Sequence, residues 1–184
     1  AVIPCRRHEG GLGSHVLTQK LPSDLPAQHF ANRWWDSVTD LAAAATDKAV
    51  AAQITPHLGQ HAVFRDNVFA ALNTAFLHDA ALIIVQRNMQ ASAPVHLLFI
   101  ATQKETASYP RCLLLAESGS EVTVIEDYVA LQEEAYFTNA VTEIVLADNA
   151  RVNHIRVQRE GDQAFHIANC AVSLARASRY HSVS

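Results

Sequence analysis

The sequence is poor in features that mark several large classes of protein. Among its 184 residues are only three cysteines, Cys5, Cys112 and Cys170. They are widely spaced and odd in number, which does not fit the disulfide framework of a small secreted domain. The formal net charge of -4 offers no broad basic surface for nucleic acid or for an anionic membrane. We therefore expect reduced thiols, no nucleic-acid partner and no membrane partner.

Long hydrophobic runs are also lacking. The longest ones, residues 80–85 and 95–101, are far shorter than the roughly 20 apolar residues of a membrane-spanning helix. No secretory signal pattern precedes them. Hydrophobic residues nevertheless make up 49% of the chain, which is ample for a packed core. These features predict a globular protein of the cytoplasm.

Motifs for nucleotide binding and nucleophilic catalysis are missing as well. The sequence contains no Walker-type phosphate loop and no dinucleotide fingerprint, so any ATP binding is expected in a partner. The pair Ser14-His15 and the residue Ser182 lack the flanking glycines of a nucleophile elbow. We expect no enzymatic activity by that route.

The second half of the chain does contain one pattern, repeated three times. Residues 115–125, 146–155 and 174–183 each read as strand, small polar turn and strand, at a spacing of 28 to 31 residues. Repeats of this length indicate stacked units that cannot bury their apolar faces alone. The prediction is a β-solenoid. The last copy stops at Ser184 without a polar cap, so we expect a truncated solenoid whose open end favours self-association.

The first part of the chain favours helices, apart from a loop over residues 1–20. Pro26 precedes apolar residues at helical spacing, and the alanine-rich stretch 41–52 favours helix by propensity, with Asp47 able to restart it as a cap. Asn67 is placed to cap a further helix. The expected fold class is α+β, with a mostly helical region over 1–80 and a strand-rich region over 81–184.

From about Val68 to Ser184, short landmarks in a fixed order resemble those of the SufB/SufD family of iron–sulfur cluster assembly proteins, and the last of them favours the SufD branch. The landmarks are Phe69-Ala70-Ala71-Leu72-Asn73-Thr74-Ala75-Phe76, Pro94-Val95, Pro110-Arg111, Ile125-Glu126-Asp127-Tyr128, Thr138-Asn139, Thr142-Glu143, Asn149-Ala150, His154, Gln158 and Phe165-His166-Ile167.

The resemblance implies a helical region followed by the first coils of a right-handed parallel β-helix. It also implies a non-catalytic scaffold that acts with a SufB-like partner and a SufC-like ATPase, and an iron–sulfur cluster at the level of that complex. Family members are considerably longer, so the chain would be the N-terminal portion. The resemblance assigns no catalytic, cofactor-binding or metal-binding residue to this chain.

Two sets of residues nevertheless deserve consideration as metal ligands. His57 and His61 have the spacing of two ligands on a helix, but Gly59 interrupts that helix and no suitable third ligand follows. A solvated loop is the simpler interpretation. Cys112 and Cys170 lie in predicted strands, where unpaired cysteines are usually small buried hydrophobes. An iron or cluster site there would need convergence with neighbouring histidines, for which His154 and His166 are the candidates.

Two other functions remain open at this point. A carbohydrate-active β-helix enzyme needs two carboxylates several ångströms apart, which would come from Glu126, Asp127, Glu133, Glu134 and Glu143. A charged loop between coils explains those residues more simply. The other alternative is a generic β-solenoid interaction module that binds another chain by strand addition.

Overall fold

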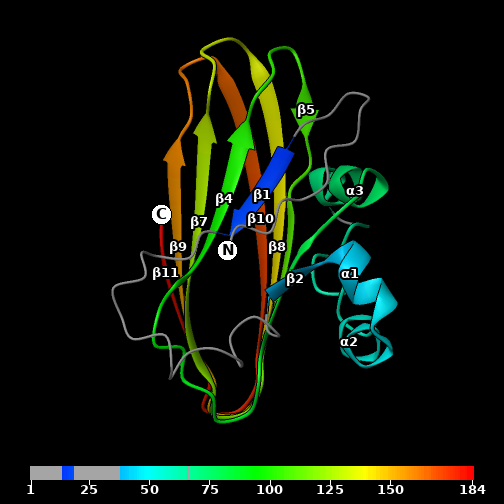
Figure 1. Cartoon of the computed structure of the whole chain (residues 1–184), viewed down its shortest axis with the longest axis vertical. Coiled ribbons are helices and arrows are strands. Elements are labelled where there is room, and N and C mark those ends of the chain that lie inside the picture. Colours follow the sequence, from blue (N-terminus) through cyan, green and yellow to red (C-terminus); the bar gives the residue numbers. More distant parts are fainter. Residues whose placement is uncertain (1–13, 19–37, 66) are drawn as a thin grey trace.

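A computed structural model describes residues 14–18, 38–65 and 67–184 of the chain (Figure 1). Most of the helix expected after Pro26, and also Cys5, lie outside these residues. Residues 14–18 form a strand, β1, which pairs antiparallel with residues 97–101, so the loop expected over residues 1–20 is wrong at this point.

Two parallel sheets dominate the described part of the chain, which crosses from one to the other and back through four coils (Figure 1). The predicted β-solenoid is therefore confirmed. The sheet beside the helices, here the helix-side sheet, contains β2 (Val38–Asp40), β3 (Ala81–Val85), β5 (Ala107–Ser108), β6 (Arg111–Ala116), β8 (Tyr136–Leu146) and β10 (Ala164–Leu174). The opposite sheet contains β1 (Ser14–Thr18), β4 (Val95–Ala101), β7 (Glu121–Ala130), β9 (Arg151–Arg159) and β11 (Arg179–Val183).

The turns that connect the helix-side sheet to the opposite sheet form a regular stack. Each has one residue with positive φ: Asn88 at 59°, Gly119 at 71°, Asn149 at 60° and Ala177 at 55°. The N–H of Asn88, Gly119 and Asn149 donates in each case to a carbonyl of the next turn, over 2.9–3.0 Å. Glycine and asparagine accept positive φ readily, whereas alanine does so at a cost. The polar turns of the sequence repeat are thus the stacked corners of the solenoid.

Three short helices lie outside the helix-side sheet: α1 (Leu41–Thr46), α2 (Lys48–Ile54) and α3 (Val68–Ala75). The Asp47 carboxylate accepts from the N–H groups of Ala49 and Val50, which separates α1 from α2 as the sequence indicated. Asn67 caps α3, also as expected. The expectation of a mostly helical region over 1–80 was too strong, because outside these helices the described residues up to 80 form turns, loops and the strands β1 and β2.

Two apolar cores hold these layers together. One fills the solenoid between its sheets and includes Leu97, Leu114 and Ile144, each with at most 1% of its surface exposed. The second lies between the helix-side sheet and the helices, and includes Ile54, Leu82 and Leu113. Both faces of the helix-side sheet are therefore buried, which explains why β3 and β6 are almost continuously apolar. None of the described helices is long and apolar enough to cross a membrane.

Candidate functional site: two buried carboxylate networks

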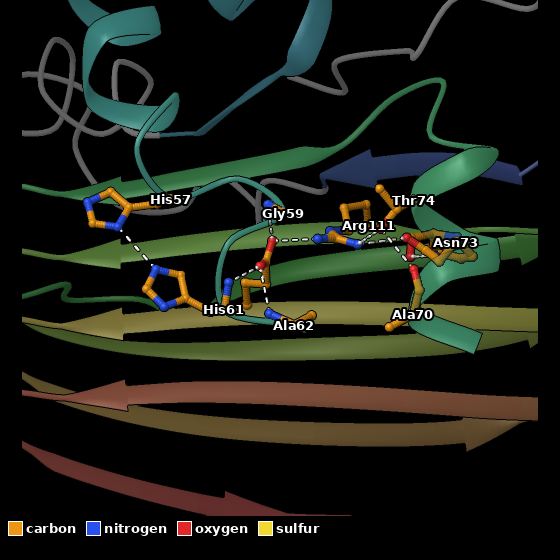
Figure 2. A network of polar contacts seen from close by, with 10 residues as sticks. His57, Gly59, His61, Ala62, Ala70, Asn73, Thr74 and Arg111 are labelled. Carbon is orange, nitrogen blue, oxygen red and sulfur yellow. Dashed lines mark hydrogen bonds and ion pairs between the residues drawn. The ribbon is translucent and has the colours of Figure 1, made fainter. Parts of the chain in front are cut away.

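The first network is centred on Glu143, a carboxylate on the outer surface of β8. Its Oε2 accepts from the N–H of Gly59 at 2.8 Å and from Nη2 of Arg111 at 2.6 Å. Its Oε1 accepts from the N–H groups of His61 and Ala62 at 2.8 and 2.9 Å. The side chains of Glu143 and Arg111 have no solvent-exposed surface. Figure 2 shows Gly59, His61 and Ala62, which supply these N–H groups, on one loop close to Arg111.

Asparagine side chains extend the same network to helix α3. Nη1 of Arg111 donates to Oδ1 of Asn73 at 3.1 Å (Figure 2). Nδ2 of Asn73 donates to the carbonyls of Pro110 and Asn139 at 2.9 and 2.7 Å. Nδ2 of Asn139 in turn donates to the carbonyl of Phe69. Asn73 and Asn139 are fully buried. The network therefore fastens both the 59–62 segment and α3 to the solenoid.

Electrostatics in this network favour the ionised carboxylate. Burial alone would raise the pKa of Glu143, but hydrogen bonds from the N–H groups of Ala62 and Gly59, together with the charge of Arg111, lower it below its ordinary value. A buried charge pair is tolerated when its remaining lone pairs and protons are satisfied. Glu143 has a donor set of this kind.

His57 and His61, the candidate metal ligands of the sequence, lie beside this network. Nδ1 of His57 is 3.1 Å from Nε2 of His61, the two rings are nearly parallel at 16°, and their centroids are 5.4 Å apart. The two nitrogens face each other (Figure 2), as in an N–H···N hydrogen bond. Among the described residues, no group of three or more His, Cys, Asp or Glu side chains is arranged to hold a metal ion.

The second network lies inside the solenoid and is centred on Glu126 of β7. Its carboxylate accepts from Oγ1 of Thr142 at 2.6 Å and from the hydroxyl of Tyr128 at 3.1 Å. Nε2 of His154 lies 3.3 Å from Oε1, and Nε of Arg156 lies 3.7 Å from Oε2. Glu126 is completely buried and His154 is 2% exposed. This is an ion pair in the middle of an apolar core.

His154 connects this carboxylate with the last coil. Its Nδ1 is 2.8 Å from the hydroxyl of Tyr180, which is 3.7 Å from Sγ of Cys170. Burial lowers the pKa of His154, but contacts with Cys170 and Glu126 outweigh it and raise that pKa to about 9. The pKa of Glu126 is lowered, because the partners His154, Thr142 and Arg156 outweigh desolvation. The pair is therefore an imidazolium and a carboxylate at neutral pH.

The two cysteines of the repeats occupy equivalent interior positions. Cys112 lies opposite Thr142 in the β6–β8 pairing, and Thr142 lies opposite Cys170 in the β8–β10 pairing. Cys112 is 2% exposed, and burial raises the pKa of its thiol well above the ordinary value. Cys170 is partly buried and approaches His154, which is the convergence that the sequence left open, but His166 lies elsewhere.

His166 belongs to a separate polar cluster around Glu160, which follows β9. Nδ1 of His166 donates to Oε2 of Glu160 at 2.6 Å, and the hydroxyls of Thr138 and Tyr136 donate to Oε1 at 3.2 and 3.3 Å. Burial and the neighbouring carboxylate raise the pKa of Tyr136 to about 12. A cavity of about 10 Å³ beside Thr138 and Glu160 has room for one water molecule. The cluster ties β8, β10 and the β9–β10 turn together.

The carboxylates considered for glycan cleavage do not share a groove. Glu126 faces the solenoid interior, whereas Glu143 faces the helices, and both are completely buried. Asp127 is paired with Arg159 and with His96 on the opposite sheet. Glu134 is exposed in a loop beside Lys104, and Glu133 is exposed next to it. Three of the five carboxylates are thus held by partners and the two exposed ones are neighbours in a loop, so the geometry disfavours the glycosidase alternative.

The sequence contains one signal for these networks that the predictions above do not include. Arg111 and Glu143 each stand in a strand whose other residues are mostly apolar. Charged residues are almost never fully buried unless they are paired. An arginine and a glutamate in two such strands therefore predict an ion pair between their side chains. The contribution of the backbone N–H groups of residues 59–62 had no comparable signal.

Comparison with known proteins gives these networks a family context. Residues 99–184 match the family model described as "SUF system FeS cluster assembly, SufBD core domain". This part of the chain is similar to the SufBD core. The resemblance found in the sequence is thus confirmed, and Arg111, Glu126, Glu143 and His154 lie within the matched core.

Proteins similar to this chain carry matching names. An iron–sulfur cluster assembly SufBD family protein of Synechocystis sp. is 35% identical over 171 residues, which cover 88% of this chain and 36% of that protein. The SufD proteins of Escherichia coli and Bacillus subtilis are 34% and 30% identical over 113 and 91 residues, covering 59% and 48% of this chain. Those segments are 26% and 21% of the two SufD proteins, so the chain spans about a third or less of these relatives.

Proposed function

We propose that this chain is part of a non-catalytic scaffold subunit, of the SufD type, in a SUF iron–sulfur cluster assembly complex. The observation that carries the proposal is the match of residues 99–184 to the SufBD core. The geometry is consistent with a structural role, because the buried carboxylates are occupied by donors of the chain itself. The iron–sulfur cluster is the cargo of the complex and is held at the level of the assembled complex.

The proposed partners are a SufB-like scaffold protein and a SufC-like ATPase in the cytoplasm. The sequence has no nucleotide-binding motif, so ATP hydrolysis belongs to the ATPase. Movement of the ATPase would rearrange the scaffold pair and expose the site of cluster assembly. Relatives of the chain are much longer, and the docking surfaces are expected in the part of those proteins that this chain does not span.

The test is co-purification of the full-length protein with SufB-like and SufC-like proteins under reducing conditions, followed by iron and sulfide analysis. We expect the wild type to retain both partners and to support cluster formation. Recovery of neither partner by a correctly folded full-length protein would refute the assignment and favour a generic interaction module.

A matched pair of variants separates fold from function in this test. Glu143→Ala removes the carboxylate that joins the helices to the solenoid, whereas Glu134→Ala removes an exposed carboxylate whose neighbour is Lys104. We expect Glu134→Ala to behave as wild type. Residues 1–184 alone should bind neither partner strongly, because the proposed docking surfaces lie outside them.

A further inference from the structure

The loop after α2 joins two histidines to the buried carboxylate of Glu143. We propose that His57 and His61 form a proton-sensitive latch, which holds residues 57–62 against the solenoid when the pair carries at most one extra proton and releases them when both rings are protonated. This inference does not depend on the role in cluster assembly.

The geometry of the two rings carries the first step. Nδ1 of His57 and Nε2 of His61 face each other at 3.1 Å, a distance at which one nitrogen donates a proton and the other accepts it. Two neutral imidazoles satisfy this arrangement, and so does one imidazole with one imidazolium. Two imidazolium rings do not, because both nitrogens would then carry protons and both rings a positive charge.

The position of the pair carries the second step. The rings lie at the two ends of a short segment whose N–H groups, from Gly59, His61 and Ala62, hold the carboxylate of Glu143 (Figure 2). His61 therefore serves both the ring pair and, through its backbone, the carboxylate. Gly59 has a positive φ of 76°, which lets the chain turn between the two histidines. Separating the rings would displace the segment that supplies the three donors.

The charged groups around the latch set its direction with pH. Burial and the charge of His61 lower the pKa of His57 from its ordinary value of 6.5, while Glu143 of β8 opposes them. Arg111 of β6 is bound to the same carboxylate. A histidine whose pKa is lowered by folding stabilises the folded protein above pH 6.5. This stabilisation is lost as the pH falls through the pKa that the histidine has in the folded protein. The latch is therefore closed at neutral pH and opens on acidification.

Glu143 itself responds in a different pH window. Its pKa is lowered from an ordinary value of 4.5, so its contribution is lost only below that pH. In this proposal the opening of the histidine pair lies at a higher pH than the protonation of Glu143, whose carboxylate is held by Arg111 and three backbone N–H groups. The intermediate state has a loosened 57–62 segment, while the solenoid and the Arg111–Glu143 ion pair persist.

Amide hydrogen exchange in the full-length protein, resolved at residues 59, 61 and 62, tests the latch. After correction for intrinsic rates, we expect protection of these amides to fall by about tenfold between pH 7.5 and pH 5.5. Amides of β8 should keep their protection over the same range. Unchanged protection at residues 59, 61 and 62 would overturn the proposal.

Two variants show whether the histidine pair is the cause. His57→Phe keeps an aromatic ring but cannot form the N–H···N bond or take up a proton, so protection at residues 59–62 should no longer depend on pH in this range. His181→Gln, at an exposed position of β11, should leave the wild-type pH response intact. A wild-type response in His57→Phe would overturn the latch. Stoichiometric zinc binding at neutral pH that requires both His57 and His61 would also overturn it.

Discussion

Glu143 and Glu126 are both completely buried carboxylates, but the protein neutralises them in different ways. Glu143 receives three backbone N–H groups from a distant part of the chain and one arginine. Glu126 is surrounded by side chains of neighbouring coils, with His154 and Thr142 in closest contact on other strands. The first carboxylate is a joint between the helices and the solenoid. The second links layers within the solenoid.

Both regions lose the contribution of a carboxylate on acidification, because the pKa values of Glu143 and Glu126 are both lowered, but they differ in the response of their histidines. The Glu143 region loses stability on acidification, because the lowered pKa values of His57 and Glu143 both favour the deprotonated groups. The interior pair also contains a histidine, but one whose pKa is raised to about 9 and whose contribution is therefore lost on the alkaline side. The same residue type thus stabilises one region as a neutral or singly protonated pair and the other as a cation.

The largest expected effect on stability comes from removing the arginine of the Glu143 network. Arg111→Met leaves Glu143 buried without its cation, and we expect a loss of about 3–5 kcal/mol in the free energy of unfolding. Urea denaturation at pH 7.5 measures it. Arg111→Met combined with Glu143→Met should not restore wild-type stability, because the N–H groups of residues 59–62 would lose their acceptor. Full recovery in the double variant would show that those amides contribute little.

The interior pair is tested on the alkaline side. Since the pKa of His154 is raised from 6.5 to about 9, its contribution of about 3 kcal/mol should be fully present below pH 6.5 and lost as pH rises through 9. Denaturation curves at pH 6.5 and at pH 9.5 measure the difference. In His154→Gln this alkaline loss should largely disappear. A wild type equally stable at both pH values would contradict the imidazolium assignment.

A smaller effect compares one hydroxyl from each network. Thr142→Val keeps the side-chain shape but removes the 2.6 Å hydrogen bond to Glu126, so we expect a loss of about 1.5–3 kcal/mol. Thr74→Val removes a weaker 3.4 Å contact with Arg111 and a hydrogen bond to the carbonyl of Ala70 within α3. Its effect should be smaller. Thermal and urea unfolding measure both losses. If the two variants lost the same amount of stability, this distinction between the interior and the outer face would not hold.

The smallest expected effect on stability concerns a turn that contacts neither carboxylate, and it serves as a reference. Ala177 has a φ of 55° in the last stacked turn, where the equivalent turns have asparagine or glycine. Ala177→Gly should relieve the backbone strain and raise the free energy of unfolding by about 0.5–1 kcal/mol. The gain should be the same at pH 5.5, 7.5 and 9.5. A gain that varied with pH would mean that the turn is coupled to one of the networks.

The sequence predicted the solenoid well because its coils are local repeats. The period of 28 to 31 residues and the polar turns after Leu115, Leu146 and Leu174 correspond directly to strands and corners of the structure. Asp47 and Asn67 were also identified as helix caps, because capping depends on neighbouring residues. The alanine-rich stretch 41–52 is helical as predicted, but the extent of helix over residues 1–80 was overestimated, because residues 14–18 and 38–40 form strands and residues 55–65 form turns and loops.

The candidate site was harder to predict, because its contacts join residues that are far apart in the sequence. Gly59 and Glu143 meet across more than eighty positions, and one partner is a backbone N–H that any residue would provide. The glycine between His57 and His61 favoured a loop over a helical metal site, and the structure has a loop there, but the sequence did not predict that the two rings face each other. Such pairings follow from the path of the loop over the sheet and leave little trace in the sequence.

The solenoid has one edge formed by the stacked turns with positive φ and another edge on the far side of the sheets. The two edges should differ in their tolerance to insertions. Residues paired between β7 and β9 are 30 positions apart along the chain, but those paired between β8 and β10 are 28 apart. The two-residue difference falls between Arg159 and Ala164, at the edge away from the stacked turns (Figure 1). A short flexible peptide inserted after Asp162 would therefore enlarge a loop that already varies in length. The same peptide after Asn149 would interrupt the hydrogen bonds between successive turns, so the variable edge is the suitable place for a fluorescent or affinity label.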